Sequence, residues 1–421
     1  MENIKIYKGD IVFTKQTDYF ECFKDGYIVV NNNKVYGTYS SLPEEFENLE
    51  IIDYSNNLII PGFVDLHTHA PQFENRGLGL DKELIPWLET YTFIEESKFK
   101  DIDYARNVYS SFVEKLKENG TTRAVLFSSI HKEGTKILFD IVHSSGISAF
   151  IGKVNMDRNC PDYIKEDTYE SLNDTIEIIN EYANKYPLVK PIITPRFIPT
   201  CSDKMLISLG RIANEHNLKI QSHLSENQGE IDWVSELHPQ IKGYANVYNS
   251  FGLLKPKNTI MAHCVYSDEN EMNILKENGV FVAHCPASNT NLSSGIAPIK
   301  DMLNNNLNIG LGSDISAGHE ISMTKVMVLA AQLSKIKWIY NNRNSSFLST
   351  SEVFYLATKG GGQFFGKVGS FEKDYEFDAL VIDDSNLSKL DLSLEERIQK
   401  FIYIGNHTNI KKIYVCGNEI K

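Results

Sequence analysis

The sequence lacks the features that mark membrane, secreted and disulfide-bonded proteins. No uninterrupted apolar run is long enough to span a bilayer, and the start, MENIKIYKGDIVFT, lacks the apolar core of a secretion signal. The six cysteines are scattered over 421 residues without a C-x-x-C pair, which in a chain of this size indicates reduced thiols. We therefore expect a cytoplasmic protein with no membrane partner.

An excess of positive charge is also absent. The formal net charge is −13 at pH 7, whereas nucleic-acid-binding surfaces are usually basic, so we expect no nucleic-acid partner. A phosphate-binding loop is missing as well, because the segment GGGQFFG at residues 360–366 lacks the G-x-x-x-x-G-K-[ST] pattern. This segment instead predicts packing at the end of a helix.

The two ends of the chain share one pattern. Residues 1–57 alternate short β-type runs with turn residues such as Asp25-Gly26, and the last fifty residues contain the similar runs DYEFDALVIDD and IKKIYVCGNEI. The first segment predicts a small antiparallel sheet. We predict that both ends pair into one small β-sandwich domain, residues 1–60 plus 371–421, and that residues 61–370 form a second domain inserted between them.

The middle of the chain repeats a strand-then-helix rhythm. Its helix-like stretches have N-cap candidates at Asp101 and Ser202 and a closing Gly120. This α/β pattern predicts a TIM-like (β/α)₈ barrel. A doubly wound sheet is disfavoured because no G-x-G-x-x-G follows the first strand. The eight strand-like segments are GFVDLHTH (62–69), TTRAVLFSSI (121–130), ISAFIGKV (147–154), KPIITPRFI (190–198), LKIQSHLS (218–225), NTIMAHCV (258–265), GVFVAHCP (279–286) and NIGLGSD (308–314).

Histidine and carboxylate side chains stand at the ends of these segments. His67 and His69 are two residues apart, so they face the same side of a strand and can bind one metal ion. The C-terminal ends of barrel strands meet at one mouth, and independent core or surface histidines do not explain a set at so many strand ends. The other ends carry Arg196, His223 with Glu226, His263, His284 and Asp314.

A catalytic zinc site uses a few protein ligands and leaves one position for water, whose pKa it lowers to about 7. Asp314 is placed to take the proton of that water, Glu226 to move a proton to the substrate and leaving group, and His263 to hydrogen-bond the developing oxyanion. Three nitrogen ligands and one oxygen ligand are assigned to one metal ion: His67, His69, His223 and Asp314.

The motifs HTH, SHLSE, MAHC, HCPASN and GLGSD resemble those of the metal-dependent amidohydrolase superfamily, and HAPQ, TPRF and SHLSEN resemble those of its guanine deaminases. The resemblance runs from about residue 61 to 378. It implies a (β/α)₈ barrel with a flanking β domain built from both chain ends, one zinc ion per chain with iron as the alternative, a homodimer, and hydrolysis of guanine to xanthine and ammonia in guanine catabolism.

Carried over motif by motif, the resemblance implies the same four metal ligands, the catalytic residues Glu226, His263 and Asp314, and purine contacts by Gln72, Arg196 and Phe197. The amide of Gln72 is both donor and acceptor and so suits the O6 and N1–H edge of guanine, while the donor-only Arg196 suits O6. An unmatched buried polar group is penalised, which makes such pairing selective. The substrate-binding set is Gln72, Trp87, Arg196, Phe197, His223 and Glu226.

Some positions keep two interpretations. Trp87 and Phe93 either cover a flat base or pack under a long loop. His284 either faces the site without binding metal or lies outside it, and Cys264 and Cys285 are expected to face the helix layer because neighbouring strand residues face opposite ways. A bridge of carboxylated lysine between two metal ions would need a lysine at the end of the fourth strand, where this chain has arginine.

Two functional alternatives stay open. One is a deaminase or dechlorinase of the same fold that acts on an 8-oxopurine such as 8-oxoguanine, a thioadenosine or a triazine. The other, of a different class, is a catalytically inactive amidohydrolase-like binding protein, although such relatives typically lose metal ligands that this chain keeps. The cytidine-deaminase-like fold is excluded because its H-x-E…P-C-x-x-C signature is absent.

Overall fold

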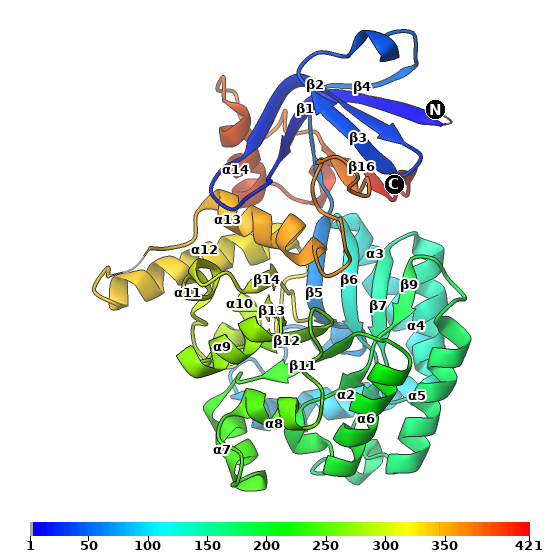
Figure 1. The fold of residues 1–421 in the computed structure, drawn as a ribbon, viewed down its shortest axis with the longest axis vertical. Helices are drawn as coiled ribbons and strands as arrows, with labels where there is room; N and C mark the ends of the chain where they lie inside the picture. The colour runs from blue at the N-terminus through cyan, green and yellow to red at the C-terminus, as the bar shows by residue number, and fades with distance from the viewer. Residues whose placement is uncertain (1–2, 345) are drawn as a thin grey trace.

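The computed structural model describes residues 3–344 and 346–421. A β-rich part that contains strands from both ends of the chain lies above a larger α/β part in Figure 1. Residues 1–2, which belong to the first segment of the predicted β domain, lie outside the described residues.

Seven strands from the two chain ends form one sheet in the order β17-β16-β15-β4-β1-β2-β3. The N-terminal and C-terminal strands join where β4 pairs with β15 in antiparallel register, Pro61 opposite Ala379. This agrees with the predicted pairing of the two ends. The strands are β1 (Ile4–Phe13), β2 (Glu21–Asn31), β3 (Lys34–Tyr39), β4 (Ile51–Pro61), β15 (Ala379–Ile382), β16 (Ile410–Val415) and β17 (Asn418–Glu419).

The sheet differs from the prediction in two respects. It is a single sheet and not the two facing sheets of a sandwich: the short helix η1 (Glu44–Phe46) covers one face by packing Phe46 against Ile6 and Val29. It is also not wholly antiparallel, because β1 and β4 run parallel. A parallel pair needs a crossover, and the β2–β3 hairpin with η1 supplies it. Period-two patterning indicates a strand but neither its partner nor the covering layer.

The α/β part contains two parallel four-stranded sheets, β5-β6-β7-β9 and β11-β12-β13-β14, and a short pair β8-β10. Each of the eight predicted strand segments contains a strand. Their bounds are β5 (Phe63–His69), β6 (Thr121–Phe127), β7 (Ser148–Gly152), β8 (Val154–Asn155), β9 (Val189–Pro191), β10 (Thr194–Pro195), β11 (Ile220–Leu224), β12 (Thr259–His263), β13 (Phe281–His284) and β14 (Asn308–Leu311).

Backbone hydrogen bonds connect the edges of these two sheets. Gln221 N donates to Ile193 O over 2.9 Å at one edge, and Asp314 N donates to His67 O over 2.9 Å at the other. Inward side chains of both sheets, among them Val64 and Ile260, pack in one apolar cluster with Phe364. Phe364 lies in the GGGQFFG segment, which therefore packs at one end of the strands.

Helices surround the strands (Figure 1). Asp101 and Ser202 cap α3 and α6 through their side chains as predicted, and Gly120, with φ of 80°, follows α3. The helices are α1 (Leu84–Trp87), α2 (Phe93–Ser97), α3 (Ile102–Glu118), α4 (Lys132–Ser145), α5 (Thr168–Tyr182), α6 (Asp203–Glu215), α7 (Gln228–Leu237), α8 (Tyr244–Ser250), α9 (Glu269–Glu277), α10 (Pro286–Asn291), α11 (Ile299–Asn304), α12 (Met323–Tyr340), α13 (Thr350–Tyr355) and α14 (Leu394–Ile404).

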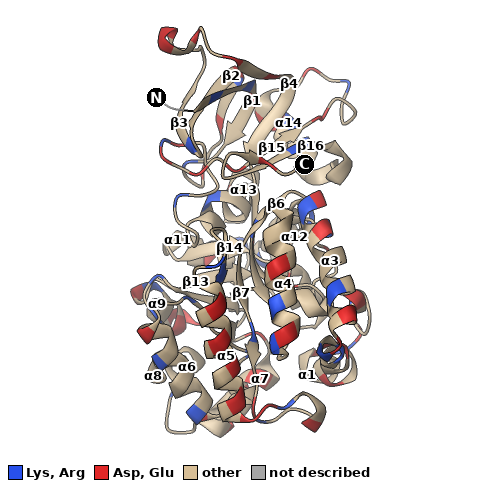
Figure 2. Ribbon diagram, turned by 90° about the vertical axis from the view of Figure 1, so that its right-hand side faces the viewer, with Lys and Arg blue, Asp and Glu red and all other residues tan. Residues whose placement is uncertain are grey.

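The outer helices α3 and α4 carry both acidic and basic residues, and α5 carries acidic residues, in Figure 2. Several form ion pairs between helices: Lys132 lies 2.7 Å from Asp174 and from Glu177, and Lys136 lies 3.1 Å from Glu181. These basic side chains are thus matched by neighbouring carboxylates. Among the helices of the described residues, none combines the length and the apolar character needed to cross a membrane.

Candidate active site

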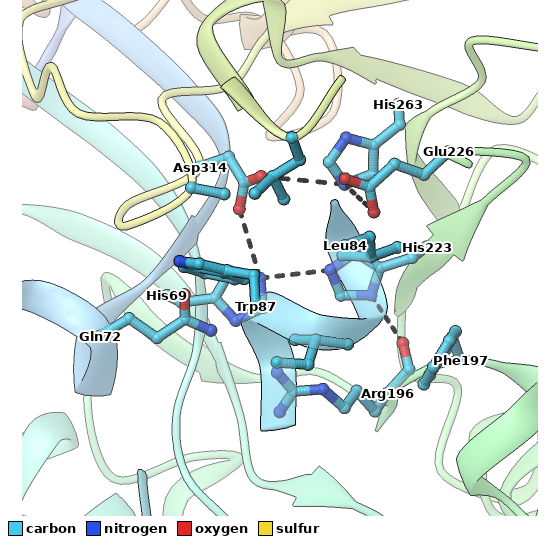
Figure 3. Close-up of a pocket in the computed structure, with 13 residues that line it drawn as sticks. His69, Gln72, Leu84, Trp87, Arg196, Phe197, His223, Glu226, His263 and Asp314 are labelled. Carbon is cyan, nitrogen blue, oxygen red and sulfur yellow. Dashed lines mark hydrogen bonds and ion pairs between the residues drawn. The ribbon is translucent and has the colours of Figure 1, made fainter. Parts of the chain in front are cut away.

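The four residues predicted to bind a metal lie together at the ends of β5, β11 and β14. In Figure 3, His69, His223 and Asp314 point toward one another. The Nε2 atoms of His69 and His223 are 3.2 Å apart, and Asp314 Oδ1 lies 3.2 Å from His67 Nε2 and 3.4 Å from His69 Nε2. All four side chains are buried.

This arrangement fits a metal ion. Ligands about 2.0–2.1 Å from a tetrahedral zinc ion are about 3.3 Å from each other, which matches the three observed separations. Both ring nitrogens of His67 and Nδ1 of His69 are buried without a hydrogen-bond partner, although such atoms are normally paired. Three groups of buried ligand atoms in the described residues satisfy the spacing for one ion: His67, His69 and Asp314; His67, His223 and His263; and His263, Cys285 and Asp314.

The protonation states also suit a metal. Burial lowers the pKa of His69 and His223 well below their usual value, so both rings are neutral at pH 7. Because His223 Nδ1 donates to the backbone oxygen of Arg196 over 2.7 Å, its Nε2 lone pair faces the cluster. Burial would raise the pKa of Asp314, but the adjacent His67 holds it well below its usual value. Metal binding needs neutral imidazoles and an ionised carboxylate.

Glu226 and His263 lie on the other side of the cluster (Figure 3). His263 Nε2 is 3.4 Å from Glu226 Oε2 and 3.9 Å from Asp314 Oδ2, and its Nδ1 donates to Asn289 Oδ1 over 2.9 Å. Burial, with the nearby carboxylates of Glu230 and Asp314, raises the pKa of Glu226 well above its usual value. This shift favours the protonated form of Glu226, which can donate a proton.

The orientation of the second His-Cys pair corrects the sequence prediction. Ala283 belongs to the inward cluster, so the next residue, His284, faces outward and lines a small cavity beside α11 and α12. Cys285 then faces inward, with Sγ within 4.8 Å of the ligand atoms of His263 and Asp314. The prediction that Cys285 faces the helix layer is wrong. Burial raises its pKa well above the usual value, which keeps it a thiol, a poor metal ligand.

The first His-Cys pair has the opposite orientation for a local reason. Ala262 also faces inward, so regular alternation would turn His263 outward. Its φ of 75° breaks the alternation, and His263 joins the cluster while Cys264 packs in the outer core as predicted. Such backbone conformations are uncommon and concentrate at functional sites.

A pocket opens beside the ligand cluster and is lined by the residues predicted to contact a purine (Figure 3). Gln72 comes from η2 (Ala70–Asn75), Trp87 from the end of α1, and Arg196 and Phe197 from the turn after β10. Trp87 lines the pocket and donates from Nε1 to the backbone oxygen of Leu78 over 3.0 Å. The site residues chosen from sequence thus share one pocket with the metal-ligand cluster.

Other residues of the site were not found from the sequence. Glu96 contacts both Gln72 and Arg196 and stands in the segment FIEESK, which has no known motif. Glu230 holds the loop of Glu226 through a capping box that begins at Asn227, and the N-x-x-E spacing before a helix is a recognisable signal for it.

The family is established by comparison with known proteins. The model of the amidohydrolase family matches residues 58–420. The chain belongs to this metal-dependent family, whose solved structures have a TIM-like barrel with a β domain, in agreement with the parallel strands and the terminal sheet.

Within the family the chain is similar to guanine deaminases over its whole length. It is 39% identical to that of Dictyostelium discoideum, covering 99% of this chain and 98% of the relative, and 40% identical to that of Mus musculus, covering 99% and 96%. A crystal structure of guanine deaminase from C. acetobutylicum with bound guanine in the active site superposes with a TM-score of 0.97 at 53% identity, covering 100% of both chains.

Proposed function

We infer that this protein is a guanine deaminase, which hydrolyses guanine to xanthine and ammonia. One observation carries the conclusion: a buried cluster of metal-type ligands and the polar side chains of Gln72 and Arg196 line one pocket. The chain that forms it is 53% identical to a guanine deaminase with guanine bound. Hydrolysis at C2 and recognition of the O6 edge then take place in the same cavity.

We propose that the metal is zinc, one ion per chain, with His67, His69, His223 and Asp314 as ligands. The donor spacing and the neutral state of the buried histidines support this set. A zinc ion held there supplies a nucleophile at neutral pH by lowering the pKa of water to about 7. Elemental analysis of freshly purified protein tests the proposal, and iron in place of zinc would overturn the metal's identity.

The recognition residues hold the base. Gln72 offers a donor and an acceptor to the O6 and N1–H edge, and Arg196 donates to O6. Trp87 and Phe197, both buried and both lining the pocket, present apolar surfaces that exclude water from the ring. This arrangement favours a 6-oxo purine over adenine, whose 6-amino group would face donors.

The catalytic residues move protons around C2. Asp314 takes the proton of the attacking water as the C2–O bond forms, and the protonated Glu226 donates to ring N3. His263 hydrogen-bonds the developing oxyanion. The ionised Glu226 then takes the proton of the C2 hydroxyl and passes it to the amino group, so that the C2–N bond breaks and ammonia leaves with xanthine as the other product. The proton held by Asp314 finally restores the protonated Glu226.

The finer points of architecture are also proposals. We propose that the eight strands close into a (β/α)₈ barrel of residues 61–370 and that residues 1–60 with 371–421 form the β domain. Hydrogen bonds between the sheet edges and the shared inward cluster support closure. β4 ends at Pro61 and β5 begins at Phe63, which supports the first boundary. Limited proteolysis should cut near 61 or 371 before cutting within either unit.

We further propose a homodimer in the cytoplasm. The dimer rests on the resemblance to guanine deaminases, and the cytoplasm on six cysteines that are all unpaired. Light scattering tests the first: a mass of one chain at micromolar concentration would overturn it. Fractionation of the source cells tests the second.

Ammonia release from a panel of bases tests the activity. The panel contains guanine, 8-oxoguanine, adenine, cytosine, a thioadenosine and a triazine, each with and without a chelator. Fast, chelator-sensitive release from guanine alone is expected. Release from another heterocycle in place of guanine would support the related-deaminase alternative, and protein purified without metal and without activity would support the inactive binding protein.

A further inference from the structure

Glu96 lies behind the pocket and contacts two of its recognition residues at once. The side chain is fully buried on α2. Gln72 Nε2 donates to its Oε1 over 2.8 Å, and Arg196 donates to its Oε2 over 2.6 Å. Glu96 does not line the pocket itself. One carboxylate therefore positions both side chains proposed to hold the O6 edge of the base.

The contact with Glu96 fixes which way the Gln72 amide points. Its Oε1 accepts from the backbone N–H of Ser316 over 3.1 Å, and its Nε2 donates to Glu96. A flipped amide would place N–H against N–H at Ser316 and oxygen against carboxylate at Glu96. The Ser316 hydroxyl lies 3.5 Å from the same Oε1 and donates over the shorter 3.0 Å to Asn75 Oδ1, which leaves Oε1 a lone pair. Since an ionised carboxylate only accepts, Glu96 leaves Gln72 with one N–H and this lone pair for the base, in a defined order.

The same carboxylate fixes the guanidinium of Arg196. Arg196 is only 3% exposed, and a buried cation needs a counter-charge. Glu96 supplies it at one edge of the guanidinium, while Phe93, one helical turn earlier on α2, lies 5.1 Å from it. The remaining N–H groups of the guanidinium stay available to an acceptor in the pocket.

We propose that Glu96 is a positioning residue that gives the enzyme its specificity for a 6-oxo purine, by orienting the Gln72 amide and neutralising Arg196. The inference rests on guanine as the substrate. It assigns specificity to a side chain that never touches the base, on a helix far in sequence from both residues it orients. Glu96 has no contact with the metal ligands, so its removal leaves the chemistry at C2 in place.

The test compares guanine with 2-aminopurine, which keeps the 2-amino group and lacks the 6-oxo group. The isosteric Glu96→Gln variant should raise the KM for guanine about 10- to 100-fold, the effect of losing a charged partner in a buried hydrogen-bond pair. The inhibition constant of 2-aminopurine should change less than about threefold, since that base makes no O6 contact. Metal content should match that of the wild type.

A matched control is Glu95→Gln. Glu95 precedes Glu96 on α2 and is also buried, but it bonds Tyr104 and Lys98 on the far side. This variant should keep the wild-type KM. If Glu96→Gln does not fold, Glu96→Asp keeps the charge with a carboxylate too short to reach both partners, and a smaller rise in KM for guanine alone is expected.

The outcomes of this experiment test the role of Glu96 separately from the proposed guanine deaminase activity. An equal weakening of guanine and 2-aminopurine, or an unchanged KM for guanine, would overturn the role of Glu96 while leaving the guanine deaminase activity in place. A wild-type protein that releases no ammonia from guanine would overturn the proposed function and the role of Glu96 with it.

Discussion

The two sides of the pocket are built in different ways. On the metal side, His67, His69 and His223 lie on the strands β5 and β11 themselves, so the backbone hydrogen bonds of the sheets fix where each imidazole lies. On the purine side, Gln72 and Arg196 come from η2 and the turn after β10, and their side chains are held by a third side chain. The first side depends on the fold and the second on a local network.

Each side also rests on one buried glutamate, in opposite electrostatic settings. Glu96 pairs with the cation of Arg196. Glu230, which supports the loop of Glu226, has only neutral donors: Tyr244 Oη donates over 2.8 Å and the backbone N–H of Glu226 over 2.9 Å. Changes on the metal side should thus remove turnover, whereas changes on the purine side should alter which base binds.

The largest effect is expected from removal of a metal ligand. His69→Ala removes one of the four proposed metal ligands, so metal content should fall to near zero and guanine turnover should drop by more than about a thousandfold. Metal analysis and ammonia release on the same sample check this. Wild-type protein stripped by a chelator should regain activity with zinc, and the variant should not. Full metal content with lost activity would remove His69 from the ligand set.

Glu226→Gln separates proton transfer from metal binding. The amide keeps the size of the side chain but cannot deliver the proton, so kcat should fall about 10²- to 10⁴-fold while metal stays bound and KM changes little. Steady-state kinetics with metal analysis measure both quantities. Loss of zinc in this variant would contradict the assignment, because Glu226 is proposed as a proton donor and not as a ligand.

Local sequence marks the metal side of the pocket more clearly than the purine side, for a physical reason. Metal ligands at a strand end can be recognised from the local sequence, such as His67 and His69, which stand two residues apart on one face of β5. The orientation of Cys285 could not be found, because the two His-Cys pairs look alike in sequence: His263 faces the site only through its positive φ, whereas His284 and Cys285 follow regular alternation after Ala283. No pattern in the nearby sequence identifies Glu96, because its partners Gln72 and Arg196 are brought to it only by folding.

The fold shows the same limit. All eight predicted strand segments contain strands, because apolar runs of this length identify a buried strand from local sequence. The prediction of a two-sheet sandwich was wrong, since the layer that covers a sheet is determined by tertiary packing and not by local sequence. Phe46 on the short helix η1 takes that place in this protein, and nothing near residue 46 distinguishes it from any other buried aromatic residue.

A smaller effect is expected on the purine side. Arg196→Ala removes a donor to O6 and leaves the carboxylate of Glu96 buried without its cation, so KM for guanine should rise about 10- to 100-fold, with a smaller change in kcat. Initial rates over a range of guanine concentrations measure it. Arg211→Ala, an exposed position paired only with Glu215, is the control. An unchanged KM for Arg196→Ala would remove this residue from the purine site.

The smallest effect concerns stability and sharpens the contrast between the two buried glutamates. Burial raises the pKa of Glu230 to about 7, against the lowering effect of Tyr244 and the backbone N–H groups. Between the ordinary pKa of about 4.5 and 7, the folded protein therefore holds a proton that the unfolded chain has lost. The free energy of unfolding falls as pH rises through this window, by about 3 kcal/mol in total from this one group.

Glu230→Gln removes the titrating group and keeps the hydrogen bonds, since an amide can accept from the backbone N–H groups and donate to Tyr244. The variant should lose this part of the pH dependence, so its stability relative to the wild type should increase from pH 5 to pH 8. Urea unfolding of both proteins at four pH values measures the difference, with Glu236→Gln, an exposed position on the same helix, as the control. Parallel curves for Glu230→Gln and the wild type would show that Glu230 is ionised in the folded protein, and the two glutamates would then differ only in their partners and not in their charge.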